Sequence, residues 1–249
     1  MEVSSEGAGV VGVVGEHPAV VDALDDRGVE TVRGDAESVL GTAPDAVVAA
    51  GEPAVVDLVR AGVDVPVLPF GAGRGLRSVP ALGVDAVTHL VTGAFDTVER
   101  PVLRASSPSG GAVALFDVML VTDEPARISE YTVRSGGARV DTFRADGVVV
   151  ATPAGSTGYA RAAGSPVVGP GTGIVSVVPI SPFATNVDSW VLDTDGVSLL
   201  VERDETPVEL LADGRPSGSV VPGETVRIRA DGSFPLAVVE ESQSFFERG

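Results

Sequence analysis

The pattern of apolar residues changes once along this 249-residue chain, and the change limits the possible folds more than any other feature. From Gly9 to about Thr92, short apolar runs alternate with segments that carry helix-start signals, which predicts strands followed by helices. From about Asp96, short strands are separated by Gly, Asp and Pro turns, a pattern typical of antiparallel hairpins. We therefore predict an α/β domain with a parallel sheet and flanking helices, followed by an all-β domain of the β-sandwich kind.

The boundary between the two patterns falls near Gly93–Asp96, without a low-complexity linker. We assign residues 1–95 to the α/β domain, residues 96–235 to the β-sandwich domain and residues 236–249 to a C-terminal tail, whose return to the first domain stays open. In the first half we expect strands at 10–14, 29–32, 46–50 and 66–69, and helices at 18–27 and 53–61. In the second half we expect turns at 135–137, 213–214 and 231–232.

The charged residues exclude several kinds of chemistry. All 17 basic side chains are arginines, against 35 acidic ones, and the chain has no Cys and only two His. Without Lys there is no phosphate-loop lysine and no Schiff base, and without Cys there is no thiol nucleophile or Cys-ligated metal. His17 and His89 are far apart in the sequence, so the residues predict no protein-ligated metal site.

A formal net charge of −18 argues against nucleic acids and anionic membranes as partners. Excess acidic residues, with Arg in place of Lys, are typical of a halophilic cytosol, where molar salt shortens the Debye length to about 3 Å. No apolar stretch approaches the roughly 18 residues of a membrane span, and the N-terminus lacks the basic region of a signal peptide. We therefore expect a cytoplasmic protein.

One segment of the second half breaks the hairpin pattern. A buried strand at 148–151 enters a turn rich in Gly and hydroxyl groups, and a short helix then ends at Gly164. Gly155 and Gly158 allow close backbone approach, while Ser156 and Thr157 offer hydroxyls beside the free N–H groups of a helix start. The same groups would serve equally well if Ser156 or Thr157 simply capped the helix.

The segment TPAGSTGYARAAGSPVV, at residues 152–168, resembles the TPTGSTAY…AGGP signature of ATP-dependent NAD kinases. Three flanking segments are also similar to that family: ADG at 145–147, VPISPF at 178–183 and ADG at 212–214. The resemblance implies an α/β domain followed by a β-sandwich, and phosphorylation of the adenosine-ribose 2′-hydroxyl of NAD. The phosphoryl donor would be ATP with Mg²⁺, or polyphosphate.

The resemblance also implies roles for individual residues. The nucleotide-binding residues of this region would be Asp146, Gly155, Ser156, Thr157, Gly158, Tyr159 and Asp213. The aromatic ring of Tyr159 is suited to stacking on a base. The family also implies a homo-oligomer, which the residues themselves do not show.

The first half departs from the family at its Gly-Gly-Asp-Gly-Thr loop, whose Asp is taken as the base for the ribose hydroxyl. This chain has Ala50-Gly51-Glu52-Pro53-Ala54 instead. Glu52 keeps a carboxylate on a side chain that is longer by one methylene. It could still act as a general base, but its carboxylate would lie roughly an ångström from the position of the family's Asp carboxylate. Glu52 and Pro53 are also typical of an ordinary helix start, and Pro53 and Ala54 remove an N–H and a hydroxyl from a phosphate-binding loop.

Two further segments resemble the family only in part. The family's Asn-Glu or Asn-Asp pair, which contacts adenosine, appears as Phe116-Asp117, so Asp117 could hold ribose hydroxyls while Phe116 offers only stacking. The loop at 71–75 supplies Gly73 and Arg74, and Arg74 with Arg77 forms a pair able to bind phosphate or to lie solvated on the surface.

Three hypotheses follow from these residues. The first is an active NAD kinase with Glu52 as the base, Asp117 on the ribose, and Gly51, Gly73 and Arg74 at the phosphates. The second is a diverged relative that binds NAD, NADP or another nucleotide without turnover. The third is a kinase of another hydroxylated substrate, because lipid kinases have a similar Gly-Gly-Asp loop and the adenosine pair is altered here.

Overall fold

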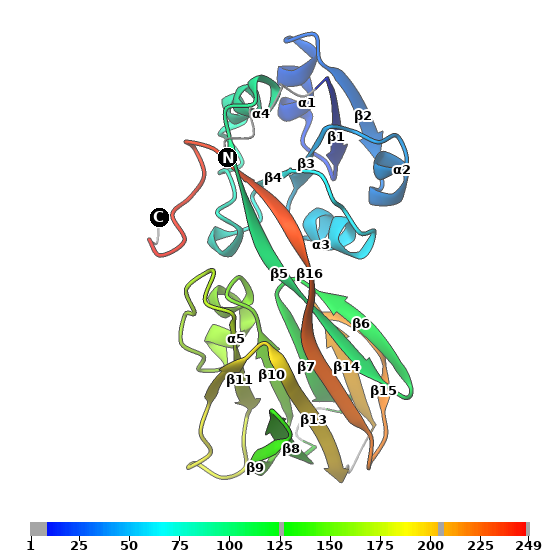
Figure 1. Cartoon of the computed structure of the whole chain (residues 1–249), viewed down its shortest axis with the longest axis vertical. Helices are drawn as coiled ribbons and strands as arrows, with labels where there is room; N and C mark the ends of the chain where they lie inside the picture. Colours follow the sequence, from blue (N-terminus) through cyan, green and yellow to red (C-terminus); the bar gives the residue numbers. More distant parts are fainter. Residues whose placement is uncertain (1–8, 125–126, 204–206, 248–249) are drawn as a thin grey trace. The chain divides into compact units, whose positions relative to one another are not determined.

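The structure is a computed structural model that describes residues 9–124, 127–203 and 207–247. The chain divides into two compact units, the first formed by residues 1–100 and 234–249 and the second by residues 101–233. Two long strands, β5 (Asp96–Ser107) and β16 (Thr225–Val238), contribute residues to both units (Figure 1).

Unit 1 contains a parallel sheet in the order β2-β1-β3-β4. Its strands are β1 (Val10–Val14), β2 (Glu30–Gly34), β3 (Ala46–Ala50) and β4 (Val67–Phe70). Its helices are α1 (Pro18–Asp25), α2 (Ala36–Leu40), α3 (Glu52–Arg60) and α4 (Val87–Thr92), with short 3₁₀ turns η1 (Arg74–Leu76) and η2 (Val84–Ala86). At the far edge, Leu236 of β16 pairs in parallel with Val67 of β4.

Both faces of this sheet are buried, which explains why its strands read as continuous apolar runs. Val11 and Val13 of β1 share one buried cluster with residues of α1 and α4. On the other face, Gly12 leaves room for the side chain of Val39 in α2, because a Cβ at Gly12 would overlap that side chain. The alternation of strand and helix in the sequence therefore becomes a parallel sheet covered on both sides.

Unit 2 is built from antiparallel strands in two sheets. One sheet has the order β12-β11-β10-β7-β14-β15, and β13, β8 and β9 continue from β16 in the other, where β5 also pairs with β6. The strands are β6 (Gly110–Ala114), β7 (Asp117–Thr122), β8 (Ser129–Ser135), β9 (Ala138–Ala145), β10 (Gly147–Ala151), β11 (Ile174–Ile180), β12 (Trp190–Asp193), β13 (Asp195–Arg203), β14 (Val208–Ala212) and β15 (Arg215–Val220). The unit also has a 3₁₀ turn, η3 (Gly155–Thr157), and a helix of one turn, α5 (Tyr159–Ala162).

The two sheets of unit 2 enclose one apolar core. Leu120 of β7 and Val148 of β10 belong to the same buried cluster as Val133 of β8 and Leu199 of β13. On the outer face of β10, Val149 and Ala151 form a smaller cluster with Ala160 of α5. The short helix after β10 is therefore fixed against the strand that precedes it.

The predicted fold class is confirmed, with a parallel α/β sheet in unit 1 and antiparallel sheets in unit 2. The turn predicted at 231–232 is wrong, because β16 continues as a strand from Thr225 to Val238. Gly232 lies inside this strand with a φ of +94°, so its positive φ belongs to an irregular strand position and not to a hairpin turn. The helix expected after Ser156 is also shorter, since Gly158 separates η3 from α5.

Candidate functional site

Thr152 begins the turn after β10 and joins it to the start of β7. Its hydroxyl donates to the carbonyl of Leu115 at 2.7 Å, and its N–H donates to the carbonyl of Phe116 at 2.9 Å. The hydroxyl also accepts the N–H of Gly155 at 3.2 Å. Thr152 is fully buried, so its side chain satisfies two groups, its backbone N–H satisfies a third, and the residue fixes the turn to the neighbouring segment.

Gly155 is required at its position by close packing. A Cβ there would overlap the carbonyl group of Phe116, so no larger residue fits without movement of the backbone. The sequence interpretation of Gly155 as a place of close backbone approach is therefore correct in kind, but the approaching group is the protein's own chain.

The two hydroxyls of the turn make internal hydrogen bonds. Ser156 Oγ donates to the carbonyl of Pro153 at 2.7 Å and accepts the N–H of Val168 at 2.9 Å, and the residue is fully buried. Thr157 Oγ1 donates to the carbonyl of Ala154 at 3.0 Å but stays partly exposed. The N-cap of α5 is Gly158, which has no side-chain cap, so the expectation that Ser156 or Thr157 caps the helix is wrong.

Asp213 lies beside the same segment, in the hairpin turn between β14 and β15. Its carboxylate accepts the N–H groups of Leu115 at 2.9 Å, Phe116 at 2.7 Å and Asp117 at 3.1 Å. Its own N–H donates to the carbonyl of Asp117 at 2.9 Å. These contacts bind Asp213 to the backbone of its neighbours, and its predicted role in nucleotide binding stays a prediction.

The structure brings most of the predicted unit 2 site together around Asp117. Asp117 starts β7 and is 5% exposed, and it pairs with Ala151, the last residue of β10. Tyr159 follows the turn and is 49% exposed, so its ring is accessible to a ligand. The result is a rigid turn with a buried carboxylate at its base and an accessible aromatic ring.

Asp146 does not belong to this group. It precedes β10, whose opposite end carries the Thr152 turn, and at about 3.3 Å per residue the strand separates the two by roughly 17 Å. Its backbone N–H donates to Ile180 and its carbonyl accepts from Thr122, which is an ordinary role at a strand end. The structure thus separates Asp146 from the other residues predicted in the ADG and TPAGST segments.

In unit 1, the predicted loop follows β3 and becomes the first turn of α3. Gly51 is the N-cap, with a φ of +84° that favours glycine and without a side-chain cap, and Glu52 and Pro53 are the first two helical residues. Gly15, at the end of β1, lies against this loop, because a Cβ there would come within 2.6 Å of the Ala50 carbonyl oxygen. The loop therefore lies at the carboxyl ends of adjacent parallel strands, where open α/β sheets bind ligands.

The second predicted loop of unit 1 packs against the C-terminal segment. Arg74 donates to the carbonyl of Phe246 at 3.0 Å, and Arg77 donates to the carbonyl of Gln243 at 3.4 Å. Gly73 has a φ of +82°, and Ser78 accepts the N–H of Gln243 at 3.2 Å. The two arginines that the sequence offered for phosphate thus already bind carbonyls of their own chain.

Three basic residues in unit 1 have environments that the sequence does not predict. The ring of His17 caps α1 by accepting the N–H of Val20 at 3.3 Å, and His89 lies 3.3 Å from the carboxylate of Glu241. Arg100 is 4% exposed, and within the described residues its Nε has no hydrogen-bond partner. Burial lowers the pKa of Arg100, and the nearby charge of Arg77 lowers it further. The His-Pro pair at a helix start was the signal for His17.

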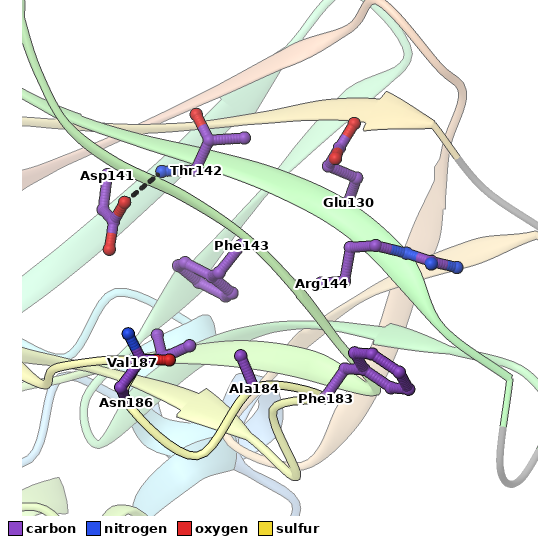
Figure 2. A pocket seen from close by; sticks show the side chains of 9 residues that line it. All are labelled: Glu130, Asp141, Thr142, Phe143, Arg144, Phe183, Ala184, Asn186 and Val187. Atoms are coloured by element: carbon purple, nitrogen blue, oxygen red, sulfur yellow. Dashed lines mark hydrogen bonds between the residues drawn. The ribbon is translucent and has the colours of Figure 1, made fainter.

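A cavity of about 310 Å³ in unit 2 lies apart from these residues (Figure 2). Its lining residues are Glu130, Asp141, Thr142, Phe143, Arg144, Phe183, Ala184, Asn186 and Val187. The guanidinium of Arg144 lies over the Phe183 ring, 5.8 Å from its centroid. None of the predicted site residues lines this cavity, so it adds nothing to their interpretation.

In the described ranges, no group of three or more His, Cys, Asp or Glu side chains is placed to hold a metal ion. Over the same residues, no helix is long and apolar enough to cross a membrane.

Comparison with known proteins decides the family. Residues 115–240 match the family model described as the ATP-NAD kinase C-terminal domain. The NAD kinase of Chloroflexus aurantiacus is 31% identical over 227 residues, which cover 84% of this chain and 82% of that protein. The chain belongs to the NAD kinase family. The family match begins at Leu115, the first residue held by Asp213.

Other members of the NAD kinase family agree with this. The NAD kinase of Methanosarcina barkeri is 29% identical over 213 residues, covering 75% of this chain and 77% of that protein. An NAD kinase from Archaeoglobus fulgidus, solved in complex with ATP, has a TM-score of 0.76 and 25% identity, with 92% of each chain covered. Yeast NADH kinase, solved with NADH, has a TM-score of 0.80 at 16% identity, covering 95% of this chain and 85% of that one, and shares the fold.

Proposed function

We propose that this chain is an NAD kinase, which transfers a phosphoryl group from ATP to the adenosine-ribose 2′-hydroxyl of NAD and produces NADP. The observation that carries the proposal is the fixed arrangement of Asp117, the Thr152–Tyr159 turn and Asp213 in unit 2. Family membership supports it, as does the complex of the Archaeoglobus fulgidus relative with ATP.

In this proposal unit 2, with the predicted domain 96–235, holds the dinucleotide. The hydroxyls of Thr152 and Ser156 and the carboxylate of Asp213 keep the turn rigid. Tyr159 stacks on a ring of the ligand, and Asp117 accepts hydrogen bonds from ribose hydroxyls. A rigid turn of this kind reduces the ordering cost of binding.

Unit 1, with the predicted domain 1–95, would bind the phosphoryl donor. The first turn of α3 has no side-chain cap at Gly51, and the positive end of a helix dipole favours an anion. Gly73 and Arg74 are assigned to the same donor, with the other N–H groups of the Arg74 guanidinium left for phosphate. Mg²⁺, when bound, would neutralise phosphate charge, and with no protein cluster in the described residues its ligands would be phosphates and water.

Glu52 is the proposed base that accepts the proton of the ribose hydroxyl. Its side chain is exposed at the first position of α3, where the helix dipole favours a negative charge. Phosphoryl transfer depends mainly on positioning and charge neutralisation, so a chain without Lys can perform it.

A specific observation favours a second candidate function, nucleotide binding without turnover. Pro53 is the second residue of α3 and has no N–H, so this helix start offers one donor fewer to a phosphate. A third candidate, phosphorylation of another hydroxylated substrate, follows from Phe116, which cannot donate to an adenine edge.

The experiment that separates these candidates measures NADP formation from NAD with ATP or polyphosphate and Mg²⁺ in molar KCl, together with calorimetry of NAD and NADP binding. We expect turnover that Glu52→Gln reduces at least about 100-fold while NAD still binds. Binding without turnover would support the second candidate. Failure of both nucleotides to bind would reject the first candidate and favour the third.

The working conditions follow from charge. The net charge of −18 and the absence of Lys support a halophilic, cytoplasmic enzyme, active at salt that screens its acidic surface. We also propose a homo-oligomer that works without nucleic acid or membrane partners. Light scattering in molar KCl tests the oligomeric state, and a maximum of turnover at low salt would contradict the halophilic assignment.

A further inference from the structure

Asp213 does more than its position in a hairpin turn requires. Asp213 and Gly214 connect β14 to β15 with φ values of +51° and +71°, as a two-residue turn with positive φ demands. Asn meets this demand as well as Asp does, because both tolerate the left-handed region. The turn alone therefore does not explain a carboxylate at this position.

The carboxylate is explained by what it holds. It accepts three successive backbone N–H groups, those of Leu115, Phe116 and Asp117, at 2.9, 2.7 and 3.1 Å. Both oxygens take part, with Oδ2 bonded to Leu115 and Oδ1 bonded to the other two. Only an ionised carboxylate offers two acceptor oxygens here, since an amide would turn N–H donors toward N–H donors.

The segment that Asp213 holds is the one against which the nucleotide-binding turn is built. The Leu115 carbonyl accepts from Thr152 Oγ1 at 2.7 Å, and the Phe116 carbonyl occupies the space that a side chain at position 155 would need. Residues 115–117 are therefore fixed from two sides, by Asp213 through their N–H groups and by Thr152 through the carbonyls of Leu115 and Phe116. A shift of this segment would move Asp117 and the turn together.

We infer that Asp213 is a positioning residue of the nucleotide site, which sets the place of Asp117 and of the Thr152–Tyr159 turn through the backbone without touching the ligand. The inference rests on the proposed function for its readout in NAD affinity. Its structural part, the fixing of residues 115–117, stands on the hydrogen bonds alone.

The test compares Asp213→Asn with Glu224→Gln. Asp213→Asn keeps the turn and removes an acceptor oxygen. Glu224 is a matched control in the same unit, because its carboxylate accepts Ser109 N at 2.7 Å, Ser109 Oγ at 2.9 Å and Val221 N at 3.2 Å without contacting residues 115–117. Both variants lose hydrogen bonds to a carboxylate, so a general loss of stability affects both.

We expect Asp213→Asn to raise the Kd and the KM for NAD by about tenfold or more, since each hydrogen bond to a charged group contributes on this scale. We expect kcat to change less, because the residue acts on the placement of the ligand. Glu224→Gln should leave the Kd within about twofold, as substitutions away from a site usually do. An equal rise of the Kd in both variants would overturn the inference.

Amide hydrogen exchange provides a readout that does not depend on activity. In Asp213→Asn, exchange should accelerate at Leu115, Phe116 and Asp117, and remain slow there in Glu224→Gln. Unchanged exchange at these amides would overturn the inference, even if NAD binding fell. If the wild type bound neither NAD nor NADP, the proposed function would fail while the exchange data still decided whether Asp213 fixes the segment.

Thr152→Val gives a second variant that acts on the same segment from its other side, with nearly unchanged shape. Because Asp213 and Thr152 share residues 115–117, their effects on NAD affinity should be non-additive in a double-mutant cycle, whereas Glu224→Gln and Thr152→Val should add. Additive effects of Asp213→Asn and Thr152→Val would contradict positioning through a shared segment.

Discussion

The turns after β10 in unit 2 and after β3 in unit 1 both connect a buried strand to a helix, but their polar groups are used differently. In unit 2 the hydroxyls of Thr152 and Ser156 and the carboxylate of Asp213 are bonded within the protein. In unit 1 the helix start at Gly51 has no side-chain cap. The polar groups of the first turn are thus bonded within the protein, whereas the second turn begins its helix without a side-chain cap.

In the proposed function, the turn in unit 2 serves binding and the loop in unit 1 serves catalysis. A rigid frame holds a ligand at low ordering cost, while the chemistry of phosphoryl transfer depends on the charge and position of a few groups. Unit 2 resembles the family at the Thr152–Tyr159 turn and at Asp213 but departs from it at Phe116, and unit 1 departs from it at Glu52 and Pro53. The comparison therefore predicts that substitutions in the frame of unit 2 weaken binding and that substitutions at the loop after β3 in unit 1 change the rate.

The largest effect is expected for Gly155→Ala, which breaks the frame. The added Cβ would overlap the Phe116 carbonyl, and a backbone clash of this kind should lower the free energy of unfolding by about 3 kcal/mol or more. NAD binding should be lost with it. Chemical denaturation and calorimetry measure the two effects.

Gly158→Ala is the matched control in the same turn. The nearest atom to its added Cβ is the Gly155 carbonyl oxygen at 3.5 Å, an ordinary contact. It should therefore cost much less stability than Gly155→Ala. Equal losses in the two variants would show that close packing at Gly155 is not what makes the turn rigid.

Arg100→Met tests the opposite situation in unit 1, a buried charge that the described residues leave without a hydrogen bond at Nε. Replacing a poorly compensated buried charge by an apolar side chain of similar length should raise the free energy of unfolding by about 2 kcal/mol. Arg33→Met, at an exposed position of β2, should change it by less than about 0.5 kcal/mol. A loss of stability in Arg100→Met, measured by urea unfolding, would show that the guanidinium is compensated.

Glu52→Asp tests whether the length of the side chain at position 52 limits the rate of phosphoryl transfer. It shortens the arm by one methylene and restores the carboxylate length of the family's loop. If Glu52 is the base, a correction of roughly an ångström should raise kcat by about tenfold, with the KM for NAD unchanged. Glu30→Asp, at an exposed position in β2, should leave kcat unchanged. A fall in kcat would show that the longer arm suits this loop.

Local motifs were predictable from the sequence, and contacts over long separations were not. The strand, the turn and Gly155 could be recognised because the residues that define them are consecutive. The role of Asp213 depends on the register of β14 with β7, in which Ala212 faces Val118 and the turn arrives beside Asp117. No pattern of consecutive residues encodes that register by itself.

The hydrogen-bond partners of polar side chains could not be predicted from the sequence either. A hydroxyl such as that of Ser156 can cap a helix, bind a ligand or bond to a distant backbone, and the return of the chain at Val168 selects the last of these. In the same way, the sequence alone allows Arg74 and Arg77 to bind phosphate. In the structure they donate to the carbonyls of Phe246 and Gln243 in the C-terminal segment. The chemistry of a residue type is local, but its partner is set by the fold.

The smallest expected effect is a pH dependence at Glu224, the carboxylate of unit 2 that holds a turn outside the site. Burial raises the pKa of Glu224, but hydrogen bonds from Ser109 and Val221 together outweigh burial and hold its pKa below the usual value. A carboxylate with a lowered pKa in the folded state adds stability above its unfolded pKa of about 4.3 and loses it as the pH falls through the folded value. The wild type should therefore exceed Glu224→Gln in free energy of unfolding by about 1 kcal/mol or less at pH 7. This difference in stability should disappear as the pH falls below about 4. Urea unfolding across this range measures it, and a difference that does not change with pH would show that the charge of Glu224 contributes nothing to holding its turn.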